Sequence, residues 1–184
     1  MTPGEIADIV QVRNQADLLH DEQAVTQAVR QMAKQITQQM ADSNPLVICV
    51  MNGGLMLTGW LTQQLTFPLQ LDYAHVTRYR GATLGGDLEW VAKPRAALRG
   101  RTLLLVDDIF DEGLTLASLV EACKKLGARE VRTAVLVRKL HERVQTDMLP
   151  DFIGLTVPDR YVFGCGMDYQ HYWRNLPAIY ALRD

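Results

Sequence analysis

The chain has 184 residues, of which 48% are hydrophobic and 22% charged, and its formal net charge is -2 with a pI near 6.1. This length and composition predict one globular domain with a substantial core and argue against disorder. The small net charge excludes a basic field that would bind nucleic acid without regard to sequence. An anionic ligand must therefore be bound by groups at one local site and not by the overall charge of the protein.

The cysteines and the N-terminal residues indicate the compartment. Cys49, Cys123 and Cys165 are an odd number, lie far apart and form no CxxC motif, so neither a disulfide framework nor a zinc site is expected. The segment MTPGEIADIV lacks the features of a signal peptide, and no apolar run approaches the roughly 20 residues that span a bilayer. We expect a soluble, cytoplasmic protein with no membrane partner.

Hydrophobic patterning predicts alternating helices and strands. Residues 21–41 have apolar side chains at helical spacing and predict an amphipathic helix. The apolar run 46–51 is bounded by Pro45 and by Asn52-Gly53-Gly54, and predicts a strand buried on both faces. A helix is expected to follow from about residue 55.

Further along the chain, residues 101–110 predict a second buried strand, and a helix over about 115–126 follows it, closed by Gly127. Residues 131–139 predict a third strand. Before these units, a strand from about residue 71, a glycine-rich loop and a returning strand near 88–92 are expected. The alternation predicts an α/β fold with a parallel-rich central sheet flanked by helices.

Four carboxylates gather after the apolar run Leu103–Val106, namely Asp107, Asp108, Asp111 and Glu112. Ligands of a parallel sheet bind beyond the carboxyl ends of its strands, so we expect the first two acids at a binding crevice. Gly113 lets the backbone approach a ligand, and the following helix offers unpaired N–H groups to a phosphate. Acids beside a phosphate require hydroxyls, a metal or a cation between them, which predicts a sugar phosphate ligand.

Two other kinds of site share this composition. Paired acids after an apolar strand also form the Mg²⁺ site of receiver domains and the second acidic motif of nucleoside triphosphatases. The chain has no GxxxxGK[ST] motif, which disfavours a triphosphatase. A receiver domain would explain neither the phosphate-type loop nor the glycine-rich excursion before the acids.

The stretch VDDIFDEGLT closely resembles the phosphoribosyl pyrophosphate (PRPP) motif of type I phosphoribosyltransferases. The C-terminal PDRYVFGCGMDYQHYWRNLPAIYAL resembles the purine-binding end of the hypoxanthine-guanine branch of that family, and VMNGGL and TRYRGATLGGDLEW extend the similarity. The resemblance implies the type I phosphoribosyltransferase fold as a single domain over residues 1–184. It also implies a mobile lid loop and a small hood formed by the N-terminal segment and about 150–184.

This resemblance implies a purine salvage enzyme that uses Mg²⁺. The enzyme would transfer the 5-phosphoribosyl group from PRPP to hypoxanthine, guanine or both, giving IMP or GMP and pyrophosphate. Alternatives are a relative that prefers xanthine or guanine, and a non-catalytic regulator that senses PRPP or a purine or binds RNA. The complete purine-binding tail favours catalysis, and the absence of a basic face argues against RNA. A homodimer or homotetramer is expected from apolar Trp and Tyr residues outside the site.

The resemblance also implies roles for the acidic segment. Asp107 and Asp108 match the pair that contacts the ribose hydroxyls, directly or through Mg²⁺. Asp111 matches the carboxylate near purine N7, where it can act as the catalytic base. The 5′-phosphate loop consists of Asp111, Glu112, Gly113, Leu114 and Thr115. Many relatives have threonine where this chain has Glu112, so this site carries an added negative charge.

The residues that the resemblance assigns to the purine base lie later in the chain. Lys139 matches the lysine that donates to purine O6, with Arg138 as the alternative if the register slips by one. An ammonium donor there selects a 6-oxopurine over adenine. Tyr161 matches an aromatic stacked on the base, with burial in the core as its alternative, and Val162 matches a residue whose backbone reads the base edge. Asp168, in the same purine-binding segment, matches a ligand of the Mg²⁺ bound by pyrophosphate.

The pyrophosphate side involves Asn52, Gly53 and Arg174. Many relatives have lysine where this chain has Asn52, and a non-proline cis peptide is characteristic of that loop in the family. Arg78 and Tyr79 lie in the stretch that resembles the lid. The implied metal ligands are Asp107, Asp108 and Asp168. The histidines, which have no metal-ligand spacing, are interpreted as solvated or capping side chains: His20, His75, His141 and His171.

Overall fold

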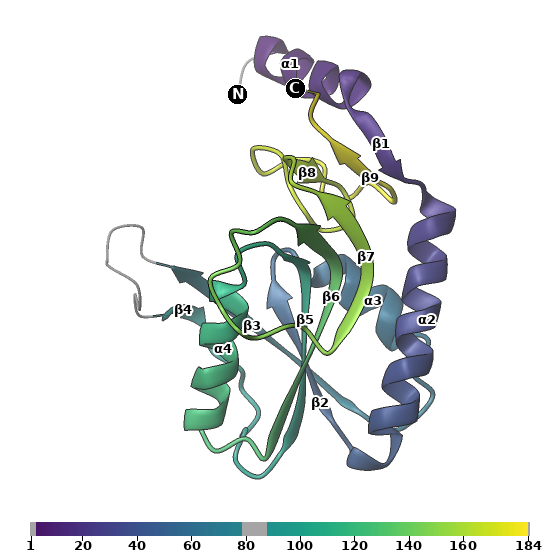
Figure 1. The fold of residues 1–184 in the computed structure, drawn as a ribbon. Coiled ribbons are helices and arrows are strands. Elements are labelled where there is room, and N and C mark those ends of the chain that lie inside the picture. The colour runs from purple at the N-terminus through teal and green to yellow at the C-terminus, as the bar shows by residue number, and fades with distance from the viewer. Residues whose placement is uncertain (1–2, 79–87, 184) are drawn as a thin grey trace.

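The computed structural model describes residues 3–78 and 88–183 of the chain, and these form two sheets and their flanking helices (Figure 1). The main sheet has the strand order β4-β3-β2-β5-β6-β7, and a small sheet has the order β1-β9-β8. The strands of the main sheet are β2 (Leu46–Met51), β3 (Gln70–Arg78), β4 (Leu88–Ala92), β5 (Thr102–Phe110), β6 (Glu130–Leu140) and β7 (Phe152–Pro158). Those of the small sheet are β1 (Asp17–His20), β8 (Val162–Phe163) and β9 (Ile179–Ala181).

Neighbouring strands of the main sheet are parallel except for β4, which pairs antiparallel with β3 at one edge. Helices α2 (Glu22–Met40) and α3 (Leu55–Thr62) cover one face, and α4 (Leu114–Lys125) covers the other (Figure 1). The chain begins with α1 (Pro3–Gln15), and a short 3₁₀ helix (Ala41–Ser43) follows α2. The predicted α/β fold with a parallel-rich sheet flanked by helices is confirmed.

Helix α2 illustrates how the sequence pattern produces packing. The carboxylate of Asp21 accepts a hydrogen bond from the backbone N–H of Ala24 at 2.8 Å, which caps the first turn. The apolar stripe expected from the spacing is buried against the main sheet and consists of Val25, Ala28, Val29, Met32, Ala33, Ile36 and Met40. The predicted helix over 21–41 therefore forms, with its ends shifted by a single residue.

The two central strands of the main sheet, β2 and β5, are buried on both faces, as their continuous apolar runs predict. Leu104 and Val106 of β5 pack in the cluster beneath α2 and α3, whereas Leu103 and Leu105 pack beneath α4. Successive side chains of a strand point to opposite faces, so one run serves both layers. This burial fixes β5, and hence the acids that follow its apolar run, at the centre of the sheet.

The small sheet lies beyond the carboxyl ends of the parallel strands, with α1 next to it (Figure 1). Strand β9 is its middle strand and pairs antiparallel with both β1 and β8. The hood is expected from about residue 150, but Phe152–Pro158 forms β7 and pairs parallel with β6 in the main sheet. The C-terminal part of the chain therefore joins the small sheet only after Pro158, beginning with β8. Among the helices of the described residues, none combines the length and apolarity needed to cross a membrane.

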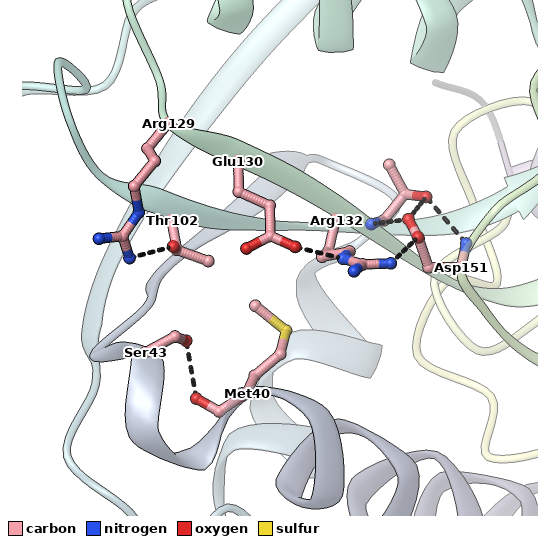
Figure 2. A network of polar contacts seen from close by, with 8 residues as sticks. Met40, Ser43, Thr102, Arg129, Glu130, Arg132 and Asp151 are labelled. Carbon is pink, nitrogen blue, oxygen red and sulfur yellow. Dashed lines mark hydrogen bonds and ion pairs between the residues drawn. The ribbon is translucent and has the colours of Figure 1, made fainter.

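A polar network secures the opposite end of the main sheet (Figure 2). The carboxylate of Asp151, just before β7, accepts hydrogen bonds from the backbone N–H and the hydroxyl of Thr133, at 2.8 and 2.9 Å. It also pairs with Arg132 at 2.9 Å, and Arg132 in turn pairs with Glu130 at 2.7 Å. These contacts join the beginning of β6 to the beginning of β7, far from the edge where ligands of a parallel sheet bind.

Candidate active site

The connection between β5 and α4 forms a phosphate-type loop. Strand β5 ends at Phe110 and α4 begins at Leu114. Between them, Gly113 has a φ of 82° and lies so close to the ring of Phe110 that a Cβ would overlap it, so a glycine is required. Among the described residues, no side chain caps the first turn of α4, so its backbone N–H groups can bind an anion.

A cavity of about 330 Å³ opens along this loop, lined by residues from Asp107 to Leu116. The lining includes all of the residues predicted for the 5′-phosphate loop: Asp111, Glu112, Gly113, Leu114 and Thr115. A second, smaller depression of about 190 Å³ lies between α2 and α3, and its lining is largely uncharged. The acids and the phosphate-type loop therefore surround the first cavity.

Asp107 and Asp108 lie within β5 rather than beyond its end, because the pairing of β5 with β6 continues to Phe110. Asp107 accepts a hydrogen bond from the backbone N–H of Asp108, and Asp108 accepts one from Ile109, at 2.9 and 2.8 Å. Burial raises the pKa of both carboxyls, and the charge of Asp108 raises that of Asp107 further. The pair is short of positive charge.

The loop after β2 reaches this acidic pair. The peptide between Met51 and Asn52 is cis, and the resemblance implies a non-proline cis peptide in this loop without saying which bond adopts it. A Cβ on Gly53 would overlap the carboxylate of Asp108, and a Cβ on Gly166 would overlap the carbonyl of Gly53. The loop after β2, strand β5 and the segment around Gly166 meet at Asp108. Positions 53 and 166 therefore both need glycine. The structure brings the predicted pyrophosphate loop and the predicted ribose-binding acids together.

Arg174 joins the C-terminal segment to the same point. Its guanidinium is 2.5 Å from the carboxylate of Asp168, donates to the carbonyl of Gly166 at 2.6 Å and lies 3.9 Å from Asp108. Asp168 also accepts a hydrogen bond from the backbone N–H of His171 at 2.8 Å. Asp168 and Arg174, which the resemblance places in one C-terminal segment, are thus direct partners beside the acidic pair.

Asp111 lies between two donors from the end of β6. The Nζ of Lys139 donates to its Oδ2 at 2.7 Å, and the Nε2 of His141 is 2.6 Å from its Oδ1. Burial alone would raise the pKa of the Asp111 carboxyl, but Lys139 and His141 outweigh this effect, so the pKa lies below its usual value. Asp111 is accordingly a carboxylate with both oxygens engaged.

A further cation, Arg143, balances acids around the loop. Its guanidinium is 2.6 Å from the carboxylate of Asp159, 3.6 Å from that of Glu112 and 3.9 Å from that of Asp111. The side chains of Asp111, His141 and Asp159 are close enough to one another to hold a metal ion. The guanidinium already supplies positive charge to two of these three groups, and it also offsets part of the charge that Glu112 adds.

Tyr161 and Val162 lie at the outer edge of the small sheet. The side chain of Tyr161 is half exposed, which excludes its interpretation as a core residue, and its hydroxyl donates to the carbonyl of Asp168 at 3.1 Å. The carbonyl of Tyr161 accepts from Leu182 at 2.9 Å. Because hydrogen bonding alternates along an antiparallel pair, the backbone N–H and carbonyl of Val162 point away from β9. Within residues 3–78 and 88–183, neither group has a backbone hydrogen-bond partner.

The residues assigned to the lid are only partly within the described part of the chain. Arg78 is the last residue of β3, and β4 returns from Leu88. Tyr79 and the glycine-rich loop that follows it lie outside the described residues. The two strands flanking the loop form as expected.

Three residues of the site were missed by sequence reasoning, namely His141, Arg143 and Asp159. The sequence predicts a solvated or capping side chain for His141, but in the structure this side chain is almost fully buried against Asp111. One signal was present in the sequence, because residues two apart at the end of a strand share a side, and His141 follows Lys139 at that interval. Arg143 and Asp159 carry no comparable pattern, since their contact joins separate loops.

The fold and the site together define an α/β protein with a phosphate-type loop and an acidic pair at the carboxyl edge of a parallel sheet. Residues 15–171 match the family model described as the phosphoribosyl transferase domain. The chain belongs to the phosphoribosyltransferase family, as the resemblance indicated.

Individual relatives are similar over nearly the whole chain. A hypoxanthine-guanine phosphoribosyltransferase of Bacillus subtilis is 32% identical, covering 90% of this chain and 92% of the relative. A hypoxanthine-guanine-xanthine phosphoribosyltransferase of Tritrichomonas foetus is 29% identical, covering 91% of each. A solved hypoxanthine-guanine-xanthine phosphoribosyltransferase superposes with a TM-score of 0.83 at 27% identity, covering 93% of this chain and 99% of that one.

Proposed function

We propose that this protein is a purine salvage enzyme that transfers the 5-phosphoribosyl group from PRPP to hypoxanthine or guanine. The products are IMP or GMP and pyrophosphate. The observation that supports this most directly is the contact of Lys139 with Asp111 at the rim of the phosphate-type loop. A donor for O6 and an acceptor for N7–H of the same 6-oxopurine lie side by side there.

On the PRPP side, the loop from Asp111 to Thr115 binds the 5′-phosphate through the first N–H groups of α4. Asp107 and Asp108 bind the ribose hydroxyls. The loop at Asn52 and Gly53, together with Arg174, binds the pyrophosphate. The convergence of these segments on Asp108 supports this assignment, because ribose and pyrophosphate are adjacent groups of PRPP. Arg78 and Tyr79 belong to a lid that excludes water from the reaction.

On the base side, Tyr161 stacks on the purine and the backbone of Val162 reads its edge. The exposure of the Tyr161 ring and the outward direction of the Val162 backbone groups support both roles. N7–H of the base takes the place of Lys139 at Oδ2 of Asp111, and the released ammonium donates to O6. Asp111 then accepts the N7 proton as N9 attacks the anomeric carbon of PRPP.

Mg²⁺ is the proposed cofactor, with Asp107, Asp108 and Asp168 as its ligands. The fit is electrostatic: the acidic pair is buried with raised pKa values, and Arg174 approaches Asp108 only to 3.9 Å. Oxygen ligands of this kind suit Mg²⁺, which neutralises phosphate charge and supports the departure of pyrophosphate when bound. The chain's own residues orient the ribose and hold the base.

Turnover of hypoxanthine, guanine, xanthine and adenine with PRPP and Mg²⁺ tests the function. We expect turnover of hypoxanthine or guanine, and little with adenine, because its 6-amino group would face the Lys139 ammonium donor to donor. A preference for xanthine would identify the protein instead as a relative that prefers xanthine or guanine. Tight, salt-sensitive RNA binding without turnover would refute the enzyme and favour a regulator.

We further propose that residues 1–184 act as one domain and that the protein is a cytoplasmic homodimer or homotetramer. Exposed apolar side chains on β4, an edge strand of the main sheet, and on its neighbour β3 support self-association, namely Leu71 and Tyr73 on β3 and Val91 on β4. Light scattering during size-exclusion chromatography measures the mass directly, and a monomer at micromolar concentration would contradict this part of the proposal.

A further inference from the structure

His141 has a more constrained environment than any surface role requires. Its side chain is only 4% exposed, and its Nε2 is 2.6 Å from Oδ1 of Asp111. Its other ring nitrogen, Nδ1, accepts a hydrogen bond from the backbone N–H of Arg143 at 3.0 Å. Both ring nitrogens therefore have partners of opposite character, one an acceptor and the other a donor.

This pair of contacts determines the tautomer of the ring. Because Nδ1 accepts from the Arg143 amide, it carries no proton, and the single proton of the neutral imidazole lies on Nε2. That proton points at the carboxylate of Asp111. The turn that follows β6 thus presents His141 to Asp111 as a fixed hydrogen-bond donor.

Asp111 depends on such a donor because it lies in the connection after β5, outside the strand pairing. In the base-free protein, Lys139 and His141 each hold one of its carboxylate oxygens. In the proposed reaction, Lys139 leaves Asp111 for the purine O6. His141 then remains as the donor that keeps the carboxylate oriented.

We propose that His141 is a positioning residue for the reaction, which rests on the proposed function: it holds Oδ1 of Asp111 so that Oδ2 faces N7 of the purine. His141 touches neither the base nor PRPP and acts through Asp111. Misplacing a catalytic group by about 1 Å costs on the order of 10²-fold in rate, so a lost anchor is expected to lower kcat rather than substrate binding.

A metal ion bound by Asp111, His141 and Asp159 is the competing interpretation of the same cluster. The guanidinium of Arg143 lies 2.6 Å from Asp159 and 3.9 Å from Asp111, so a cation already occupies the side of the cluster where an ion would be needed. The hydrogen-bonded tautomer also directs Nε2 to the carboxylate with a proton rather than with a lone pair. Both features favour positioning.

Two conservative variants separate the contacts of the ring. In His141→Gln, the amide nitrogen can replace Nε2 as the donor to Asp111. In His141→Asn, the shorter amide oxygen can replace Nδ1 as the acceptor from Arg143, but the side chain does not reach Asp111. His141→Ala removes both contacts, and Glu142→Ala alters the exposed neighbour as a matched control.

The kinetic measurement compares kcat and KM for hypoxanthine and PRPP in all four variants. We expect His141→Asn and His141→Ala to lower kcat by about 10- to 100-fold with little change in KM for PRPP, and His141→Gln to recover most of kcat. Glu142→Ala should behave like the wild type. Equal kcat values in the Gln and Asn variants, or an unchanged kcat in His141→Ala, would overturn the positioning role.

Nitrogen-15 NMR of labelled histidine provides a measurement that is independent of turnover. We expect the Nε2–H tautomer for His141, with an Nε2 proton resonance that is lost in Asp111→Ala. A Nδ1–H tautomer would overturn the inference. If the wild type turns over none of the four bases, the proposed function fails and this inference fails with it. Turnover in the wild type with normal kcat in His141→Asn would refute only the role of His141.

Discussion

Lys139 and Asp111 contact each other directly, with Nζ 2.7 Å from Oδ2, although the two residues are assigned to different atoms of the purine. The ammonium is shielded, since the Lys139 side chain is only 12% exposed. In the proposed reaction, binding of the purine would therefore exchange one hydrogen-bond partner for another at each of these two groups. Such an exchange would couple recognition of O6 by Lys139 to the release of Asp111 for its role at N7.

Asp111→Asn tests the general base. The amide keeps the shape of the side chain and one acceptor oxygen but cannot take the N7 proton. We expect kcat to fall by about 10²- to 10⁴-fold while PRPP binding stays nearly intact. Steady-state kinetics and calorimetric binding of PRPP measure the two quantities separately. A near-normal kcat would remove Asp111 from the mechanism.

Lys139→Ala tests the reading of O6. We expect KM for the oxopurine to rise far more than KM for PRPP, because a donor to the base is deleted and the sugar phosphate site is left in place. The comparison variant is Arg138→Ala, since Arg138 is the neighbouring cation on β6. If the arginine variant shows this behaviour and the lysine variant does not, the residue that reads O6 is Arg138.

Asn52→Lys tests how the site balances the phosphates of PRPP. A site with few fixed cations must rely on Mg²⁺ to offset the ligand charge, so we expect a steep requirement for free Mg²⁺ that is partly relieved in Asn52→Lys. Glu112→Thr should have a smaller effect, because Arg143 lies 3.6 Å from Glu112 and already offsets part of its charge. Titrating Mg²⁺ at fixed PRPP decides the matter, and an unchanged or steeper metal dependence in Asn52→Lys would contradict it.

Asp151→Ala tests the polar network at the other end of the sheet (Figure 2). The variant leaves the backbone N–H of Thr133, a buried residue, without its partner at 2.8 Å. We expect a loss of about 1–3 kcal/mol in the free energy of unfolding, with kcat unchanged, because the network is remote from the site. Glu130→Ala, which breaks only the exposed pair with Arg132, is the control and should change stability by about 0.5 kcal/mol or less. Equal destabilisation by the two variants would contradict the prediction.

Asp17 provides a prediction for pH. The hydrogen bonds from Arg160 and Arg183 hold the pKa of the Asp17 carboxyl below its usual value of 3.8. A carboxyl with a lowered pKa in the folded state stabilises the protein above its unfolded pKa, and this stabilisation disappears as the pH falls through the folded value. The difference in melting temperature between the wild type and Asp17→Asn should therefore be present at neutral pH and vanish in acid below 3.8. A difference that stays constant across this range would refute the role of the charge.

The elements that could be predicted from the sequence are those whose signal is local. The spacing of Val25, Val29 and Met32 predicts α2, and the apolar runs of β2 and β5 predict strands buried on both faces. Gly113 predicts a loop whose backbone can approach a ligand closely, and in the structure it directly precedes α4. Each of these patterns lies within a few residues and has one physical interpretation.

Contacts between distant segments were beyond local patterns. Strands β8 and β9 are only two and three residues long, too short to show a period, and their pairing joins positions far apart in the chain. The contact of His141 with Asp111 likewise depends on the parallel register of β5 and β6, which brings the two strand ends together. The roles of Asp107, Asp108 and Asp168 came from the family resemblance, since charge patterns alone fit several kinds of metal site.

The middle position of β9 in the small sheet has a consequence for truncated forms of the protein. Strand β8, which carries Val162 beside Tyr161, is joined to β1 only through β9, the last strand of the described chain. The strands of the main sheet and the phosphate-type loop all come before Ile179 in the chain. A deletion that begins at Ile179 would therefore separate β8 from β1 while it leaves every strand pairing of the main sheet in the sequence.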